Sequence, residues 1–283
     1  MIKELKATAK LMQGKPLDTV YIGGGTPTTL EADQLDRLLG TIRENFDLEH
    51  VLEFTVEAGR PDSITREKLE VIRKYPVTRI SVNPQTMQQK TLDLVGRKHT
   101  VEDVEQIFHL AREFGFDNIN MDLIAGLPGE DAADMQDTLE KIEKLHPDSL
   151  TVHALAIKRA AKFGQEGRTM DPGTEITQMV EAAAASAERM GLVPYYLYRQ
   201  KNIAGNFENV GYAEQDKAGV YNILIMEEKQ AILACGAGAS TKRVWNLPDG
   251  YHIERCENVK DIKQYIARID EMIERKKALF EKD

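Results

Sequence analysis

A run of three glycines is the part of this chain most suited to hold a ligand. Gly23, Gly24 and Gly25 directly follow the apolar stretch Val20–Ile22 and lead into Thr26, Pro27 and Thr28. Glycines let another molecule approach the backbone closely, and exposed N–H and C=O groups can bind its ammonium or carboxylate. An isolated glycine run is more often only a tight turn. The Thr-Pro-Thr continuation, between a predicted strand and a predicted helix, favours a ligand-binding turn here.

Three other side chains carry chemistry at the predicted ends of later strands, Glu57, Gln85 and Asp122, and a fourth, Arg97, follows Val95 and Gly96. An ionised aspartate inside an apolar strand, such as Asp122, is costly unless it is paired or bound to a ligand; a structural salt bridge is the competing interpretation. Glu57 could accept hydrogen bonds from an amine or a ribose hydroxyl, or could be a solvated loop residue. Arg97 suits a ligand carboxylate because its planar guanidinium binds such groups bidentately, although a plain surface charge looks the same in sequence.

Apolar strands alternate with helical patterns in the first half of the chain. This rhythm, with short loops, predicts a parallel sheet with right-handed crossovers, in a barrel or partial barrel. Ligands of such folds bind at the carboxyl ends of the strands, where the glycine run, Glu57, Gln85 and Asp122 fall. The predicted strands are Leu17–Ile22, Leu52–Val56, Arg79–Val82, Asn118–Ile124 and Ser149–Ile157; the predicted helices are Glu31–Asn45, Thr65–Lys74, Thr86–Leu94, Val101–Phe114 and Asp131–Leu145.

The rhythm changes after Ile157, so we expect a core over residues 1–160 and a smaller α+β extension over residues 161–283. A polar, glycine-containing stretch at 158–173 predicts an exposed loop. Further along, the pattern predicts an alanine-rich helix at Thr174–Met190, possible added strands at Tyr195–Tyr198 and Ala231–Cys235, and a charged helix at Val259–Lys277.

Composition narrows the class of protein. The chain has 283 residues, of which 42% are hydrophobic, and a formal net charge of −9, which argues against nucleic acid or an anionic membrane as a partner. It has two cysteines, far apart in the sequence, which exclude a disulfide framework and fit a reducing cytoplasm. The first residues predict an amphipathic helix rather than a signal peptide.

Taken in order, several segments resemble the oxygen-independent coproporphyrinogen III oxidase family of radical SAM (S-adenosylmethionine) proteins, and most closely its coproporphyrinogen dehydrogenase branch. The resemblance covers nearly the whole chain. Its carrying stretches read YIGGGTPTTL (21–30), EFTVEAGRPDSI (53–64), RISVNPQTMQQKTLDLVGRKHT (79–100), NINMDLIAGLPG (118–129), TVHALAIKR (151–159), NFENVGYA (206–213) and CGAGAST (235–241).

The resemblance implies a fold, two cofactors and a reaction. The fold is a partial (β/α) barrel of radical SAM type. Gly24, Gly25 and Thr26 would contact the amino group and methionyl part of SAM, and Glu57, Gln85, Arg97, Asp122 and Ala156 match positions that hold the rest. One electron from a [4Fe-4S] cluster would start oxidative decarboxylation of coproporphyrinogen III propionates to vinyl groups. An electron donor and a tetracarboxylate substrate follow as partners, with Lys158, Arg159, Arg199, Lys201, Lys242 and Arg243 as candidate contacts.

One part of the family pattern is absent. The family's CxxxCxxC loop holds the cluster, and no cysteine precedes Cys235 here, nor do the six histidines show metal-ligand spacing. We therefore predict no metal-binding and no catalytic residues. We expect a truncated chain that lacks the first barrel strand, with an open apolar edge at Leu17–Ile22 and no activity by itself. The alternatives are a haem-binding chaperone of the same superfamily, whose HNxxYW stretch is missing, and a non-catalytic SAM-binding module.

Overall fold

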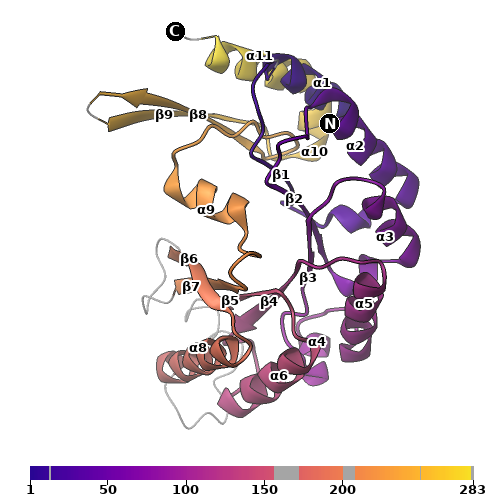
Figure 1. Ribbon diagram of the computed structural model, residues 1–283, viewed down its shortest axis with the longest axis vertical. Coiled ribbons are helices and arrows are strands. Elements are labelled where there is room, and N and C mark those ends of the chain that lie inside the picture. Colours follow the sequence, from indigo (N-terminus) through magenta and orange to yellow (C-terminus); the bar gives the residue numbers. More distant parts are fainter. Residues whose placement is uncertain (13, 156–171, 200–207, 249, 282–283) are drawn as a thin grey trace.

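The computed structural model describes residues 1–12, 14–155, 172–199, 208–248 and 250–281. A seven-stranded sheet in the order β1-β2-β3-β4-β5-β7-β6 curls into a half-barrel (Figure 1). Strands β1 to β5 are parallel, whereas β7 pairs antiparallel with β5, and β6 with β7. The predicted partial barrel is therefore confirmed. The strands are β1 (Thr19–Ile22), β2 (Glu53–Gly59), β3 (Arg79–Val82), β4 (Ile119–Ala125), β5 (Ser149–Ala154), β6 (Val193–Arg199) and β7 (Glu208–Ala213).

Helices cover the convex face of this sheet (Figure 1). Their side chains pack with alternate residues of the strands, such as Phe54 and Val56 of β2 or Met121 and Leu123 of β4, in one apolar core. The helices are α2 (Ala32–Asn45), α3 (Arg66–Arg73), α4 (Gln89–Leu94), α5 (Val101–Glu113), α6 (Ala132–Leu145) and α8 (Pro172–Arg189); short 3₁₀ turns span Pro27–Thr29 and Pro61–Ser63. Because α8, β6 and β7 join this same sheet and core, the division near residue 160 stays a prediction.

Capping residues fix where the helices begin. The Thr65 hydroxyl accepts a hydrogen bond from the Lys68 N–H, which confirms the predicted start of α3. Thr100 and Asp131 form capping boxes at the starts of α5 and α6. The predicted helix at Thr86–Leu94 is shorter, since α4 begins at Gln89 and the preceding residues belong to the loop whose Gln85 lines the site described below.

The concave face of the sheet carries polar side chains, because successive side chains of a strand point to opposite faces. On β2 these are Glu53, Thr55 and Glu57. Helix α9 (Val220–Glu227) lies on this side of the sheet (Figure 1). Its Tyr221 ring stacks on Tyr21 of β1 at 4.1 Å between centroids, and the Val220 N–H donates to the Glu53 carboxylate at 2.6 Å. The half-barrel is therefore lined by polar groups and bounded on its open side by α9.

The last part of the described chain forms a hairpin, β8 (Ser240–Leu247) with β9 (Gly250–Glu257), and two helices, α10 (Ile262–Ala267) and α11 (Ile269–Phe280). Two predictions were wrong here. Residues Ala231–Cys235 do not join the large sheet, because their ladder is limited to one bridge from Ile232 to Lys242 of β8. The helix predicted at Val259–Lys277 is two helices, separated at Arg268.

Helix α1 (Ile2–Leu11) is held against α11 by a buried ionic cluster. Glu4 and Lys276 form an ion pair with exposed fractions of 0% and 1%. The Glu4 carboxylate also accepts hydrogen bonds from Tyr265, from the Asn258 amide at 2.7 Å and from the Gly236 N–H at 2.9 Å. Burial acts most strongly on the pKa of Glu4 and would raise it, but the hydrogen bonds from Lys276, Tyr265 and Asn258 together leave that pKa below its usual value.

Within the described residues, β1 forms one edge of the large sheet and pairs only with β2, which agrees with the predicted open edge. Its four residues are all half-buried. No helix among the described residues has the length and apolar character needed to cross a membrane.

Candidate functional site

The glycine run forms an exposed loop at the carboxyl end of β1. Gly24 has a φ of 82°, in the left-handed region that glycine tolerates best, and a Cβ added to Gly24 or Gly25 would meet nothing within 4 Å. Gly23 differs, because a Cβ there would lie 2.4 Å from the Tyr21 ring and 2.5 Å from Glu57 Oε2. Gly23 thus lets the loop pack on the floor of the site, while Gly24 and Gly25 leave open space above it.

Glu57 and Asp122 form an acidic pair on the concave face next to this loop. Burial raises the pKa of Glu57, and the Asp122 carboxylate raises it further; hydrogen bonds from the Tyr21 hydroxyl and the Gly24 N–H act in the opposite direction. The Asn120 amide donates to Asp122 at 2.7 Å, and His153 Nε2 lies 3.8 Å from the same carboxylate. The place of His153 in a strand indicates a core or rim histidine, and its side chain is 37% exposed. The pair can accept hydrogen bonds from a cationic or hydroxyl-bearing ligand.

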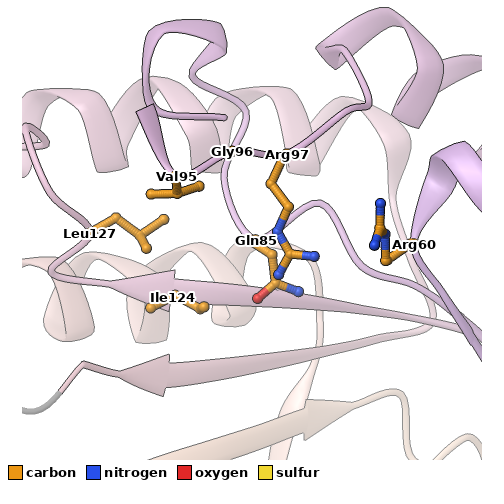
Figure 2. Close-up of a pocket in the computed structure, with 7 residues that line it drawn as sticks. All are labelled: Arg60, Gln85, Val95, Gly96, Arg97, Ile124 and Leu127. Atoms are coloured by element: carbon orange, nitrogen blue, oxygen red, sulfur yellow. The ribbon is translucent and has the colours of Figure 1, made fainter. Parts of the chain in front are cut away.

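Arg97 and Gln85 line a cavity of about 340 Å³ at the same edge of the sheet. Figure 2 shows the Arg97 side chain reaching toward Gln85 and lying between Arg60 and the apolar side chains. Val95, Gly96, Ile124 and Leu127 complete the lining. We call this cavity the arginine pocket. It combines two guanidinium groups and a carboxamide with an apolar wall.

The Arg97 guanidinium is available for an anionic ligand. Within the described residues, no carboxylate forms an ion pair or hydrogen bond with it, whereas Arg60 donates to Asp62 through Nε at 3.1 Å and Nη2 at 2.6 Å. Burial lowers the pKa of Arg97, and the charge of Arg60 lowers it further, against the opposing effect of Asp62. A carboxylate entering the pocket would oppose both effects on the pKa of Arg97, because it would pair the charge of this guanidinium.

Gln85 is held in place by its backbone. Its φ of 69° is uncommon for a residue with a side chain and costs on the order of 1–3 kcal/mol unless its surroundings hold it. Two hydrogen bonds to β4 do so: the Gln85 N–H donates to the Asp122 carbonyl at 3.0 Å, and the Gln85 carbonyl accepts from the Ile124 N–H at 2.9 Å. These bonds join the arginine pocket to the strand that carries the acidic pair.

The structure thus brings Gly24, Glu57 and Asp122 together and places Gln85 and Arg97 in one pocket; Gly25 and Thr26 continue the glycine loop. Ala156, Lys158, Arg159 and Lys201 lie outside the described residues, as does the side chain of Arg199. Lys242 and Arg243 lie on β8 of the hairpin; Lys242 is buried, and Arg243 stacks on Trp245 and donates to the Leu279 carbonyl at 2.8 Å.

Sequence reasoning missed Arg60 and Tyr21. Arg60 follows β2 immediately, so the rule that ligands bind at strand ends would have found it if the strand had been predicted to run to Gly59. Tyr21 lies on the same face of the sheet as the acidic pair, and the pKa of Tyr21 is raised by burial and by the charges of Glu57 and Asp122. No group of three or more potential metal ligands occurs among the described residues.

Comparison with known proteins supports one family. Residues 2–142 match the model of the Radical SAM superfamily. The chain is 47% identical over 276 residues to the oxygen-independent coproporphyrinogen-III oxidase-like protein HemZ of Bacillus subtilis (strain 168), covering 93% of this chain and 54% of that protein. It is 32% identical over 268 residues to the heme chaperone HemW of the same organism, covering 91% and 64%. The chain therefore spans between about half and two thirds of these relatives.

The fold is also found in a solved structure. Coproporphyrinogen III oxidase (HemN) from Escherichia coli superposes with a TM-score of 0.72 at 23% identity, covering 96% of this chain and 62% of that one. This likeness agrees with the half-barrel described above.

Proposed function

The chain belongs to the coproporphyrinogen oxidase family of radical SAM proteins, and on this premise we propose that the carboxyl edge of its sheet binds S-adenosylmethionine. The observation that carries the proposal is the half-buried Arg97 guanidinium, which lines a cavity of about 340 Å³ without a carboxylate partner among the described residues. The residues proposed to hold the ligand are Gly24, Gly25, Thr26, Glu57, Gln85, Arg97 and Asp122, together with Ala156.

The chemistry of these residues matches the groups of the ligand. S-adenosylmethionine carries an ammonium, a carboxylate, a sulfonium and two ribose hydroxyls. Glu57 and Asp122 are hydrogen-bond acceptors for the amine and the hydroxyls, and Arg97 can bind a carboxylate bidentately. The open space over Gly24 and Gly25 lets the ligand reach backbone N–H and C=O groups. The role of these residues is to bind and orient the cofactor.

For the whole protein we propose the oxygen-independent oxidative decarboxylation of coproporphyrinogen III propionates to vinyl groups, with an electron donor as a further partner. The [4Fe-4S] cluster that such proteins use is held by cysteine thiolates. This chain has two cysteines, Cys235 in the loop before β8 and Cys256 on β9, and these do not make a cluster site. We therefore derive no catalytic step from these residues, and the proposal for the chain itself is cofactor binding.

A second candidate is haem binding, which the 32% identity to the heme chaperone HemW favours. Haem also carries carboxylates, so the arginine pocket would accept a propionate by the same interaction. A non-catalytic SAM-binding module is the third candidate; it would bind SAM as proposed but would not contribute to decarboxylation. The first two are separated by measuring both ligands on one preparation.

The test is isothermal titration of the purified chain with S-adenosylmethionine and, separately, absorbance titration with haemin. Arg97→Met removes the guanidinium, and Arg66→Met is the matched control, because Arg66 is exposed and pairs at the surface with Glu113. A hydrogen bond to a charged group contributes about 1.5–3 kcal/mol, so Arg97→Met should raise the Kd for SAM by roughly 10- to 150-fold. Absence of SAM binding by the parent chain, or equal affinity in the two variants, would refute the proposal.

A further inference from the structure

A buried carboxylate lies behind the arginine pocket, outside the residues proposed to touch the cofactor. Glu130 ends the loop between β4 and α6 and is 2% exposed. Its Oε1 accepts a hydrogen bond from the Thr86 hydroxyl at 2.6 Å. Burial raises the pKa of Glu130, and the hydroxyls of Thr86 and Thr91 act in the opposite direction. A carboxylate buried at this cost needs a structural or functional reason.

The contact joins two of the loops that line the pocket. Thr86 directly follows Gln85, whose side chain lines the pocket, and Glu130 donates its N–H to the carbonyl of Leu127, which also lines it. The two loops are distant in sequence, since Thr86 and Glu130 are 44 residues apart. The hydrogen bond between their side chains therefore links the loop that carries Gln85 to the loop that carries Leu127.

The same contact holds the residues that follow Gln85. The N–H and C=O of Gln85, whose φ is 69°, are bonded to β4. The Thr86 hydroxyl accepts from the Gln88 N–H at 3.2 Å and lies 3.3 Å from the Thr138 hydroxyl of α6. Glu130 thus anchors a short polar chain that runs from the β4–α6 loop through Thr86 to α6 and holds the residues after Gln85.

We propose that Glu130 is a positioning residue for ligand binding in the arginine pocket, acting through Thr86 on Gln85 and through its own turn on Leu127. The proposal rests on the proposed function, in which the pocket binds part of S-adenosylmethionine. Glu130 does not face the pocket itself. Its carboxylate serves as the hydrogen-bond acceptor that fixes the two loops at one separation, so that the Gln85 amide and the Arg97 guanidinium meet the ligand in one arrangement.

The experiment compares Glu130→Ala, Glu130→Gln and Thr86→Val with the parent chain. Glutamine keeps an acceptor oxygen for the Thr86 hydroxyl, whereas alanine and the valine variant remove the bond from either end. We expect the Kd for S-adenosylmethionine to rise at least fivefold in Glu130→Ala and in Thr86→Val, and to stay within twofold in Glu130→Gln. The double variant Glu130→Ala/Thr86→Val should be no weaker than either single one, because both remove the same bond.

The matched control is Glu143→Ala. Glu143 lies on α6 and accepts bonds from Ser186 and Arg189 of α8, so its loss perturbs a neighbouring packing contact without touching either pocket loop. Its Kd should equal that of the parent. A rise in Kd for Glu143→Ala equal to that for Glu130→Ala, or an unchanged Kd in a folded Glu130→Ala, would overturn the inference.

Hydrogen exchange gives a readout that does not depend on the ligand. Amides of residues 85–88 and 127–130 should exchange at least fivefold faster in Glu130→Ala than in the parent, and at the parent rate in Glu130→Gln and Glu143→Ala. Failure of the parent chain to bind S-adenosylmethionine would refute the proposed function while this measurement still tested the loop contact. Unchanged exchange in both segments would overturn the inference whatever the ligand.

Discussion

Replacing Glu4 by glutamine tests whether the ionic cluster between α1 and α11 stabilises the fold. The substitution keeps the size of the side chain and an acceptor oxygen for Asn258, but removes the charge that Lys276 faces. With both partners almost wholly inaccessible, at 0% and 1% exposed, the Lys276 ammonium would be left buried and unpaired. Removing one partner of a buried pair costs about 3–5 kcal/mol, and we expect Glu4→Gln to lower the free energy of unfolding by this amount.

Urea unfolding followed by circular dichroism at neutral pH measures the effect. Lys276→Met should cost a similar amount, and Glu4→Gln/Lys276→Met should cost about 0.5–3 kcal/mol less than the sum of the two, because each single change strands the partner that the other removes. Lys277→Met is the control, since Lys277 is 39% exposed and pairs with Glu274 within α11; its cost should be at most about 0.5 kcal/mol. Equal effects of Glu4→Gln and Lys277→Met would refute the reasoning.

The stabilisation that this cluster gives to the fold should decrease at acid pH. The pKa of Glu4 in the folded chain lies below its usual value of 4.5, so the folded state binds the proton less readily than the unfolded chain. The stabilisation by Glu4 is therefore fully present above pH 4.5 and is lost as the pH falls through the lower folded-state value. Glu4→Gln should remove this part of the acid sensitivity, and an unchanged difference between variant and parent from neutral pH to about pH 3 would contradict the assignment.

Three further predictions concern two glycine positions and a buried histidine. Gly126→Ala should lower the free energy of unfolding more than Gly191→Ala does. Both glycines have a positive φ, but only at Gly126 would the new Cβ lie within 2.9 Å of a side chain. The difference between the two variants in urea unfolding, about 1–3 kcal/mol, therefore measures that clash. Gly24→Ala should lower the free energy of unfolding by about 1 kcal/mol because Gly24 has a φ of 82°, whereas Gly25→Ala should not lower it. Both variants should bind SAM more weakly than the parent in titration calorimetry. Parent-like affinity in both would place the ligand elsewhere. Burial holds the pKa of His99 below its usual value, so the free energy of unfolding should fall as the pH drops below about 6.5, by at most about 1.4 kcal/mol per pH unit. In His99→Gln the free energy of unfolding should depend less on pH in this range. Identical slopes for the variant and the parent would contradict this prediction.

The sequence was most informative where local rules suffice. The period of the apolar residues and the N-cap at Thr65 located the helices of the first half, and the placement of polar residues at strand ends found Glu57 and Asp122. Arg60 was missed because β2 continues to Gly59, beyond the apolar stretch from which it was predicted. A strand's true end depends on its neighbours in the sheet, which the sequence of that strand does not contain.

Contacts between distant segments could not be predicted in the same way. Ala231–Cys235 has the apolar character of a strand, yet it makes one bridge because the hairpin and not the large sheet lies beside it. Glu130 follows a glycine-containing loop and looks like a solvated residue; its burial depends on Thr86, 44 residues earlier. Nothing in the residues around Glu4 indicated that its partner is Lys276.

The pairing of Glu4 with Lys276 bears on the order in which the chain folds during its synthesis. Glu4 and Lys276 are separated by 272 positions, so Glu4 leaves the ribosome long before its partner exists. At roughly 5–20 residues per second, synthesis of the intervening chain takes on the order of tens of seconds. Throughout that time α1 cannot close over its charged residue, although the first strands and helices of the half-barrel are already available to fold. Assembly of the sheet and locking of α1 are therefore separate events on the ribosome, and the second awaits the emergence of α11.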